Sequence, residues 1–128
     1  MSAKNPKYDK IVVFLTPGHT KYTPGKHSPD KTLYEWKYNR EILSMVEKEL
    51  DKLGIQHWNS HPEEGWVDSN HKTDSKDLIL RVQRINSKYT SVKKEGKTAI
   101  MLSIHVNAAG NGISWKNATG WSAWTTKG

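Results

Sequence analysis

The chain has 128 residues, of which 34% are apolar and none is cysteine. This length fits a single domain over residues 1–128 with one hydrophobic core. The missing cysteines exclude a disulfide framework and a thiolate nucleophile, and they leave only histidine and carboxylate ligands for a metal ion. The formal net charge of +7 favours an anionic partner such as nucleic acid, an acidic membrane surface or cell-wall material.

The first expected element is a strand at residues 11–15, "IVVFL". Because this β-branched run does not alternate with polar residues, it is typical of a strand buried on both faces of a parallel sheet. It is also too short for the hydrophobic part of a secretory signal or for a membrane span. We therefore expect neither an export signal nor a membrane-spanning segment.

A helix is expected at residues 33–53, where apolar residues recur at steps of three and four and Gly54 follows as a C-terminal cap. Residues 55–58 predict a second strand, and residues 59–75 form a long polar loop with Pro and Gly. The apolar residues of a second helix are Leu78, Val82, Ile85 and Tyr89.

Residues 98–105, "TAIMLSIH", predict another buried strand, and residues 120–125 are a candidate for a last one. Strands that alternate with helices are connected by right-handed crossovers. The pattern therefore predicts an α/β fold, with an open, largely parallel sheet and helices on both faces.

Two histidines, His19 and His105, directly follow expected strands. Ligands of parallel sheets bind beyond the carboxyl ends of the strands, so this pair suggests a metal site. A single strand-end histidine is more often only hydrogen-bonded. Glu35 is the leading candidate for a third ligand, but it also fits a capping box that begins at Thr32, and the residues alone leave these two interpretations equal.

The other histidines lie in or near polar loops, and we expect them to be solvated. They are His27, His57, His61 and His71. No HExxH motif occurs in the chain, which excludes the helix-borne zinc site of the zincins.

Four motifs occur in one order along most of the chain: "TPGH" at 16–19, "EWKYN" at 35–39, "LRVQRIN" at 80–86 and "SIHVNAAG" at 103–110. In these motifs the chain resembles the catalytic domain of zinc-dependent N-acetylmuramoyl-L-alanine amidases of the amidase-3 type, a group that includes phage and prophage lysins. The most specific of them is the strand that ends in Ile-His-x-Asn-Ala.

The resemblance implies that His19, Glu35 and His105 hold Zn²⁺, and that the protein hydrolyses the amide between N-acetylmuramic acid and L-alanine in peptidoglycan. It also suggests that Asn107 contacts substrate or orients His105, although a turn-forming role at the strand end fits Asn107 equally well. A lysin of this type would act on the bacterial cell wall after release from the cytoplasm through a membrane lesion.

Two departures from the family pattern affect this interpretation. Thr16 stands where the family usually has an acidic residue, and the glutamate that acts as general base is expected beyond Gly128. No acidic residue follows Glu95, so nothing in the tail can replace that base. Glu63 or Glu64 could substitute, but they are more simply interpreted as solvated loop residues.

The domain is therefore expected to be incomplete at its C-terminus. The alternative function is a non-catalytic, zinc-containing remnant that binds peptidoglycan. Shortening of this kind should expose a sheet edge and an apolar face, which would favour self-association.

The sequence supports other classes of function less well. The six tryptophans could stack on sugars or simply pack. The lysines are scattered and no RRM, KH or helix-turn-helix signature occurs, so we expect no nucleic-acid partner. The segment "GWSAW" lacks the final glycine of a serine-hydrolase elbow.

Overall fold

A three-stranded parallel sheet organises the chain, and β1 (Ile11–Pro17) is its central strand. β2 (Gln56–Asn59) pairs with one edge of β1, and β3 (Thr98–Ile104) pairs with the other. The computed structural model describes residues 3–70 and 72–126. It confirms the first three predicted strands to within about two residues at each end.

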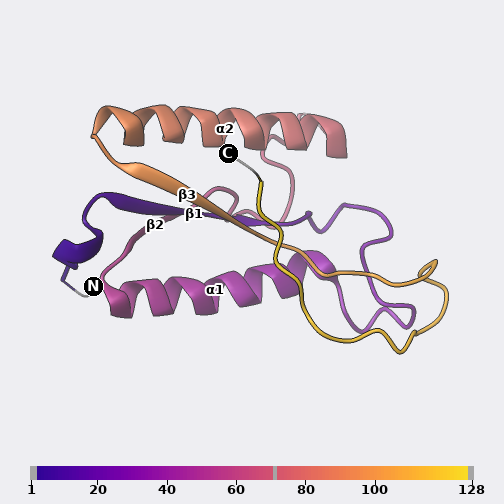
Figure 1. Ribbon diagram of the computed structural model, residues 1–128. Helices are drawn as coiled ribbons and strands as arrows, with labels where there is room; N and C mark the ends of the chain where they lie inside the picture. The colour runs from indigo at the N-terminus through magenta and orange to yellow at the C-terminus, as the bar shows by residue number, and fades with distance from the viewer. Residues whose placement is uncertain (1–2, 71, 127–128) are drawn as a thin grey trace.

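The two long helices cover opposite faces of the sheet (Figure 1): α1 (Glu35–Leu53) connects β1 to β2, and α2 (Asp74–Lys94) connects β2 to β3. The first crossover moves outward from β1, and the second returns across β1 to the far edge. Because both crossovers are right-handed by default, opposite directions place the helices on opposite faces. The predicted α/β class is confirmed. Neither helix has the length and apolar character needed to span a bilayer.

α1 begins at Glu35, two residues later than predicted, and ends as predicted before Gly54, which adopts the left-handed conformation with φ 68°. Tyr34 occupies the N-cap position and makes no side-chain capping bond. The Thr32 hydroxyl donates instead to Asp30. The capping-box interpretation of Glu35 is therefore wrong, because the chain between these residues turns before the helix starts.

A cluster of buried apolar residues lies between the sheet and α2 and contains Val12, Phe14 and Val92. Trp58, Ile85 and Ala99 pack against this cluster. Leu15 of β1 and Leu43 of α1 are buried as well. The Phe14 and Trp58 rings meet edge to face with centroids 5.2 Å apart, a favourable aromatic geometry.

The second predicted helix is confirmed, but three of its four apolar residues do not face the core: they are Leu78, Val82 and Tyr89, which are 62%, 47% and 45% exposed. The buried residues of α2 are Asp77, Arg81 and Val92. The helix is rotated so that these two charged side chains point inward beneath the carboxyl end of β1. There Arg81 donates to the backbone carbonyls of Pro17 and His19, and Asp77 accepts a hydrogen bond from Arg81.

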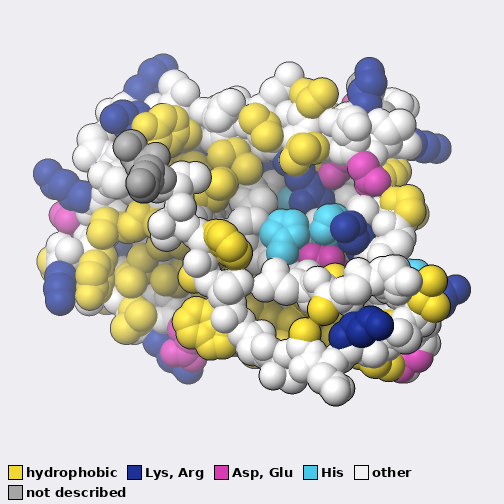
Figure 2. All heavy atoms as spheres, turned by 45° about the vertical axis from the view of Figure 1, so that its right-hand side comes forward, with side chains coloured by type: hydrophobic (Ala, Val, Ile, Leu, Met, Phe, Trp, Pro, Cys, Tyr) yellow, Lys and Arg dark blue, Asp and Glu magenta, His cyan; other side chains and the backbone are white. Residues whose placement is uncertain are grey.

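β3 was expected to be buried, and this prediction is wrong. Ile100, Met101 and Leu102 are 49%, 61% and 38% exposed. β3 lies at the edge of the sheet, where β1 is the only strand of the described residues that pairs with it. Figure 2 shows one face of the molecule, with apolar side chains gathered over its left half.

The predicted strand at 120–125 is also wrong, because the described residues from His105 to Thr126 contain no helix or strand. A strand requires a partner for its backbone groups. The hydrogen bonds of residues 120–125 are instead between side chains: Ser122 accepts from Asn107 and from Trp124.

Candidate metal centre

His19 lies just beyond the carboxyl end of β1, as predicted. The Gly18 amide donates to Ile104 O at 2.9 Å, so the pairing of β1 with β3 continues one residue past the strand. His19 itself adopts φ 61°, in the left-handed region that few side-chain-bearing residues occupy. The chain therefore turns sharply at the residue that would serve as ligand.

His105 follows β3, and its ring lies against Gly18. A Cβ atom at residue 18 would come within 2.5 Å of both Cε1 and Nδ1 of His105. Glycine is therefore required here by close approach of the ring. The two imidazoles meet edge to face, with centroids 5.1 Å apart.

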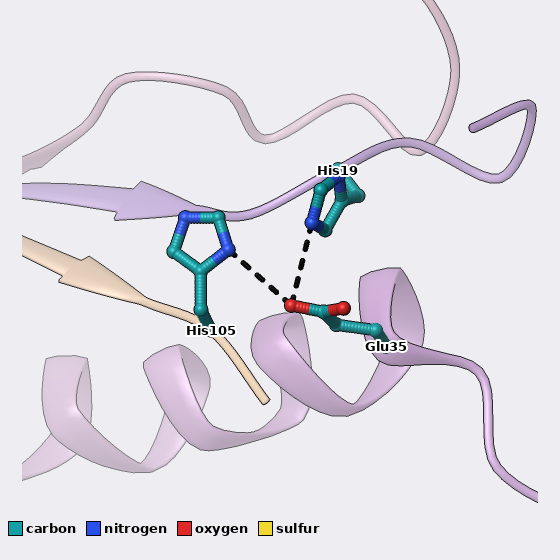
Figure 3. Close-up of side chains that lie close together, drawn as sticks. All are labelled: His19, Glu35 and His105. Atoms are coloured by element: carbon teal, nitrogen blue, oxygen red, sulfur yellow. Dashed lines mark hydrogen bonds and ion pairs between the residues drawn. The ribbon is translucent and has the colours of Figure 1, made fainter. Parts of the chain in front are cut away.

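Glu35, the first residue of α1, turns its carboxylate toward both imidazoles (Figure 3). Its Oε1 lies 3.4 Å from His19 Nε2 and 3.3 Å from His105 Nδ1. The same oxygen accepts a hydrogen bond of 2.9 Å from the Val106 amide. Three elements that are distant in sequence thus bring three side chains to one edge of the sheet.

The spacing of these atoms fits a tetrahedral metal ion. Ligands that bind zinc at 2.0–2.1 Å in this geometry are about 3.4 Å apart. The three potential ligand atoms all lie within 4.8 Å of one another. Two imidazole nitrogens and one carboxylate oxygen are also a donor set used by catalytic zinc sites, so the residues present could hold such an ion.

The protonation state of His19 suits metal binding. Burial lowers the pKa of its imidazole below the usual 6.5, and His105 and nearby cations lower it further, against the opposing effect of the Glu35 carboxylate. Neutral imidazole has the free lone pair that a metal needs. The side chain of Glu35 is 10% exposed and that of His105 is 52% exposed, so the cluster is open on the His105 side.

A buried polar network beneath this cluster was not predicted. Arg81 donates to Asp77 Oδ2 at 2.7 Å and to the carbonyls of Pro17 and His19. Arg40 also donates to His19 O, at 3.0 Å. Two sequence signals pointed to this network: the spacing of Asp77 and Arg81 by four residues on one helix, and the place of Arg81 in the motif "LRVQRIN".

His61 was expected to be solvated, and it is fully buried. Its Nε2 lies 3.0 Å from Gly65 O. Its Nδ1 lies 3.2 Å from a Glu63 oxygen, but in a geometry that makes no hydrogen bond. Because burial and the nearby Arg81 charge lower the pKa of His61 to about 4, the ring is neutral at pH 7 and donates through Nε2. The loop after β2 folds back over this ring, which sequence periodicity cannot reveal.

His27 and His57 are half-buried and bond to Ser28 O and Asp51, and neither belongs to the ligand cluster. His71 lies outside the described residues.

Of the two candidate substitute bases, Glu64 is exposed but Glu63 is not simply solvated. Both Glu63 oxygens accept bonds from Arg84, at 2.9 and 3.0 Å. Burial raises the pKa of Glu63, but the bonds and charge of Arg84 outweigh burial and hold that pKa below its usual value. A carboxylate held in this way is a weak base.

The remaining two residues singled out from the sequence lie at the same edge. Thr16 Oγ1 accepts a bond of 3.0 Å from the Ser60 hydroxyl, which keeps its side chain engaged away from the cluster. Asn107 is exposed two residues beyond His105 and donates to Ser122 Oγ at 3.0 Å.

The sequence also matches a known protein family. Residues 13–128 match the family described as N-acetylmuramoyl-L-alanine amidase. The chain belongs to this amidase family. No curated protein matches it.

A solved structure of the CwlD amidase from Clostridioides difficile, in complex with the GerS lipoprotein, is similar in fold to this amidase-family chain, with a TM-score of 0.59 and 19% sequence identity. The similarity covers 78% of this chain and 50% of that chain. The present chain thus spans about half the length of the solved amidase that it matches.

Proposed function

We propose that residues 1–128 act as a single N-acetylmuramoyl-L-alanine amidase domain, which uses zinc to hydrolyse the amide between N-acetylmuramic acid and L-alanine in peptidoglycan. One observation carries the proposal. In a chain of this amidase family, ligand atoms of His19, Glu35 and His105 converge at the carboxyl edge of the sheet, within 4.8 Å of one another.

Zinc is the proposed ion because imidazole nitrogens suit it well, whereas magnesium and calcium prefer oxygen ligands. When bound, zinc would supply Lewis acidity toward the substrate carbonyl and would lower the pKa of a water molecule. The Val106 amide, 2.9 Å from Glu35 Oε1, orients the carboxylate toward the histidines. Asn107, exposed beside His105, is proposed to contact the substrate.

The experiment is to load the protein with zinc, add purified peptidoglycan and measure new L-alanine amino termini. His105→Ala should lose both the bound zinc and the release of termini. His57→Ala is the matched control, because His57 lies outside the ligand cluster, and it should retain both. Zinc content unchanged in His105→Ala would contradict the proposal.

A second candidate is a non-catalytic domain that binds zinc and the wall. The observation in its favour is that Glu35 is the one carboxylate of the ligand cluster among the described residues, and a ligand cannot also act as general base. Loss of a general base typically lowers the rate by about 10²–10⁴-fold. Sedimentation of the zinc-loaded protein with peptidoglycan, without new amino termini, would favour this candidate over the amidase.

We further propose that the protein reaches the bacterial wall as a phage lysin does, through a lesion in the membrane. The basic balance of the chain, with a net charge of +7, suits an anionic wall. Expression in a host with and without a membrane-lesion protein tests this route. Lysis should require the lesion, and lysis without it would contradict this part of the proposal.

The exposed edge of β3 supports a proposal of self-association with a second copy. No strand among residues 3–70 and 72–126 pairs with its outer side, and Ile100 and Met101 are 49% and 61% exposed. An edge of this kind readily pairs with another strand. Sedimentation velocity should show a dimer that Met101→Lys weakens, whereas a monomer at all concentrations would contradict the proposal.

A further inference from the structure

The turn that carries His19 is held by side chains from both helices. Asn39 of α1 donates to Gly18 O at 3.1 Å. Arg81 of α2 donates through Nη1 to Pro17 O at 2.8 Å and through Nη2 to His19 O at 3.0 Å. The carbonyls of three successive residues therefore all accept bonds from helix side chains.

The His19 carbonyl receives a second charged donor, Arg40 Nη1 of α1, at 3.0 Å. Two guanidinium groups that converge on one carbonyl repel each other, so this arrangement is not expected by default. Asp77 compensates Arg81 through a bond of 2.7 Å to its Nε. Asp77 is itself fixed, because its other oxygen accepts from the Val67 amide at 2.8 Å.

This network is buried: Arg81 is 6% exposed and Asp77 is 4% exposed. Removing charges from water is costly, and buried ion pairs can often be replaced by apolar groups without loss of stability. Their presence here calls for another reason. His19 has φ 61°, a backbone conformation that persists only where the surroundings impose it.

We propose that Arg81, assisted by Arg40, is a positioning residue for the metal centre: it holds the backbone of His19 in the left-handed conformation that directs the imidazole toward Glu35. Arg81 contacts the backbone of His19 and not its ring, so Arg81 determines where the ring is placed. Without these donors the turn would relax toward commoner backbone angles, and Nε2 would move from its place 3.4 Å from Glu35.

The inference rests on the proposed zinc site, and its test measures zinc affinity by competition with a chromophoric chelator. The main variant is Arg81→Met/Asp77→Asn, which removes the charge pair together and leaves an acceptor for the Val67 amide. Its zinc affinity should fall by about 10–100-fold, as is usual when groups that orient a ligand are lost. Thermal unfolding of the metal-free variant should show that it still folds cooperatively.

Arg84→Met is the matched control on the same helix. Arg84 also donates to a backbone carbonyl, that of Ser60, and to Glu63, but neither of these groups belongs to the His19 turn. Its zinc affinity should stay within about twofold of that of the unmodified protein. An equal loss in both variants would overturn the inference, because a general structural effect would then explain it.

Arg81→Lys provides a test that does not depend on the folding of the main variant. Lysine keeps a positive charge near Asp77, but its single ammonium group cannot bond to the carbonyls of both Pro17 and His19 as the planar guanidinium does. The zinc affinity of Arg81→Lys should lie between those of the unmodified protein and of the main variant.

Unchanged zinc affinity in Arg81→Lys and in the main variant would overturn the inference while leaving the zinc site itself intact. If the unmodified protein bound no zinc, the proposed function would fail instead. The two failures are therefore distinguishable.

Discussion

The two ends of the sheet bury different kinds of residue. Toward the amino end and the middle of the sheet, Val12, Phe14 and Val92 form an apolar cluster. Around the carboxyl end the buried residues include many polar ones: Thr20, Glu35, Asn39, Ser60, His61, Asp77 and Arg81. Burial of polar groups costs free energy unless they are hydrogen-bonded, whereas burial of apolar groups stabilises the folded state. The polar residues at the carboxyl end therefore serve to position the site, and the apolar cluster contributes most of the free energy of unfolding.

The largest expected effect comes from breaking the apolar end. Phe14 is 1% exposed and packs on Trp58, so Phe14→Ala should lower the free energy of unfolding by about 3–5 kcal/mol. Urea denaturation followed by tryptophan fluorescence measures this loss. A loss below about 1 kcal/mol would show that the core lies elsewhere.

The next effect concerns the buried His61 at the polar end. The pKa of His61 in the folded state is about 4, below the usual 6.5. Between pH 4 and pH 6.5 the unfolded chain therefore binds a proton at His61 that the folded chain does not bind. The contribution of neutral His61 is complete above about pH 6.5 and should be lost as the pH falls toward 4, on the order of 3 kcal/mol in all.

His61→Gln keeps a side-chain donor for Gly65 O but does not titrate. Its free energy of unfolding should therefore depend less steeply on pH between 6.5 and 4 than that of the unmodified protein. Urea denaturation at several pH values checks this expectation. Equal slopes in the two proteins would contradict the assignment.

A smaller effect is expected at Gly18. Because a Cβ would come within 2.5 Å of the His105 ring, Gly18→Ala should displace that ring and weaken zinc binding by about 10–100-fold. The half-exposed His105 ring can turn aside, but the added Cβ would also lie 2.9 Å from Nδ2 of the buried Asn39. The metal-free protein should therefore lose about 1–3 kcal/mol of stability. Gly25→Ala is the control for zinc binding, since a Cβ there meets no atom within 4 Å, although the positive φ of 68° at residue 25 should itself cost about 1 kcal/mol of stability. Comparable zinc affinity in the two variants would argue against close packing at Gly18.

The smallest effect is expected on the outer face of α1. Lys52 pairs with Glu49 at 2.6 Å, but both side chains are largely exposed. Lys52→Ala should change the free energy of unfolding by less than about 0.5 kcal/mol. A loss as large as that of Phe14→Ala would contradict the contrast between core and surface.

Sequence patterns predicted the parts of the fold that local periodicity determines. The apolar runs at 11–15 and 98–105 and the helical repeats gave the sheet and both helices. The carboxyl ends of β1 and β3 then brought His19 and His105 together, because neighbouring parallel strands end at one edge.

Features that depend on tertiary neighbours were missed. Which face of α2 turns inward depends on bonds from Arg81 to the His19 turn, and not on the apolar repeat of that helix. The exposure of β3 depends on what lies beside it, and the burial of His61 depends on how the following loop folds back. Local patterns carry no information about such distant contacts.

The most direct test of the account is to measure zinc stoichiometry, together with X-ray absorption at the zinc edge. We predict one zinc ion per chain, bound by two imidazole nitrogens and a carboxylate oxygen, with the ion lost in His19→Ala and in His105→Ala but retained in His57→Ala. An ion retained in full by His19→Ala and His105→Ala, or a ligand shell without imidazole, would contradict the central claim that these three elements form one metal centre.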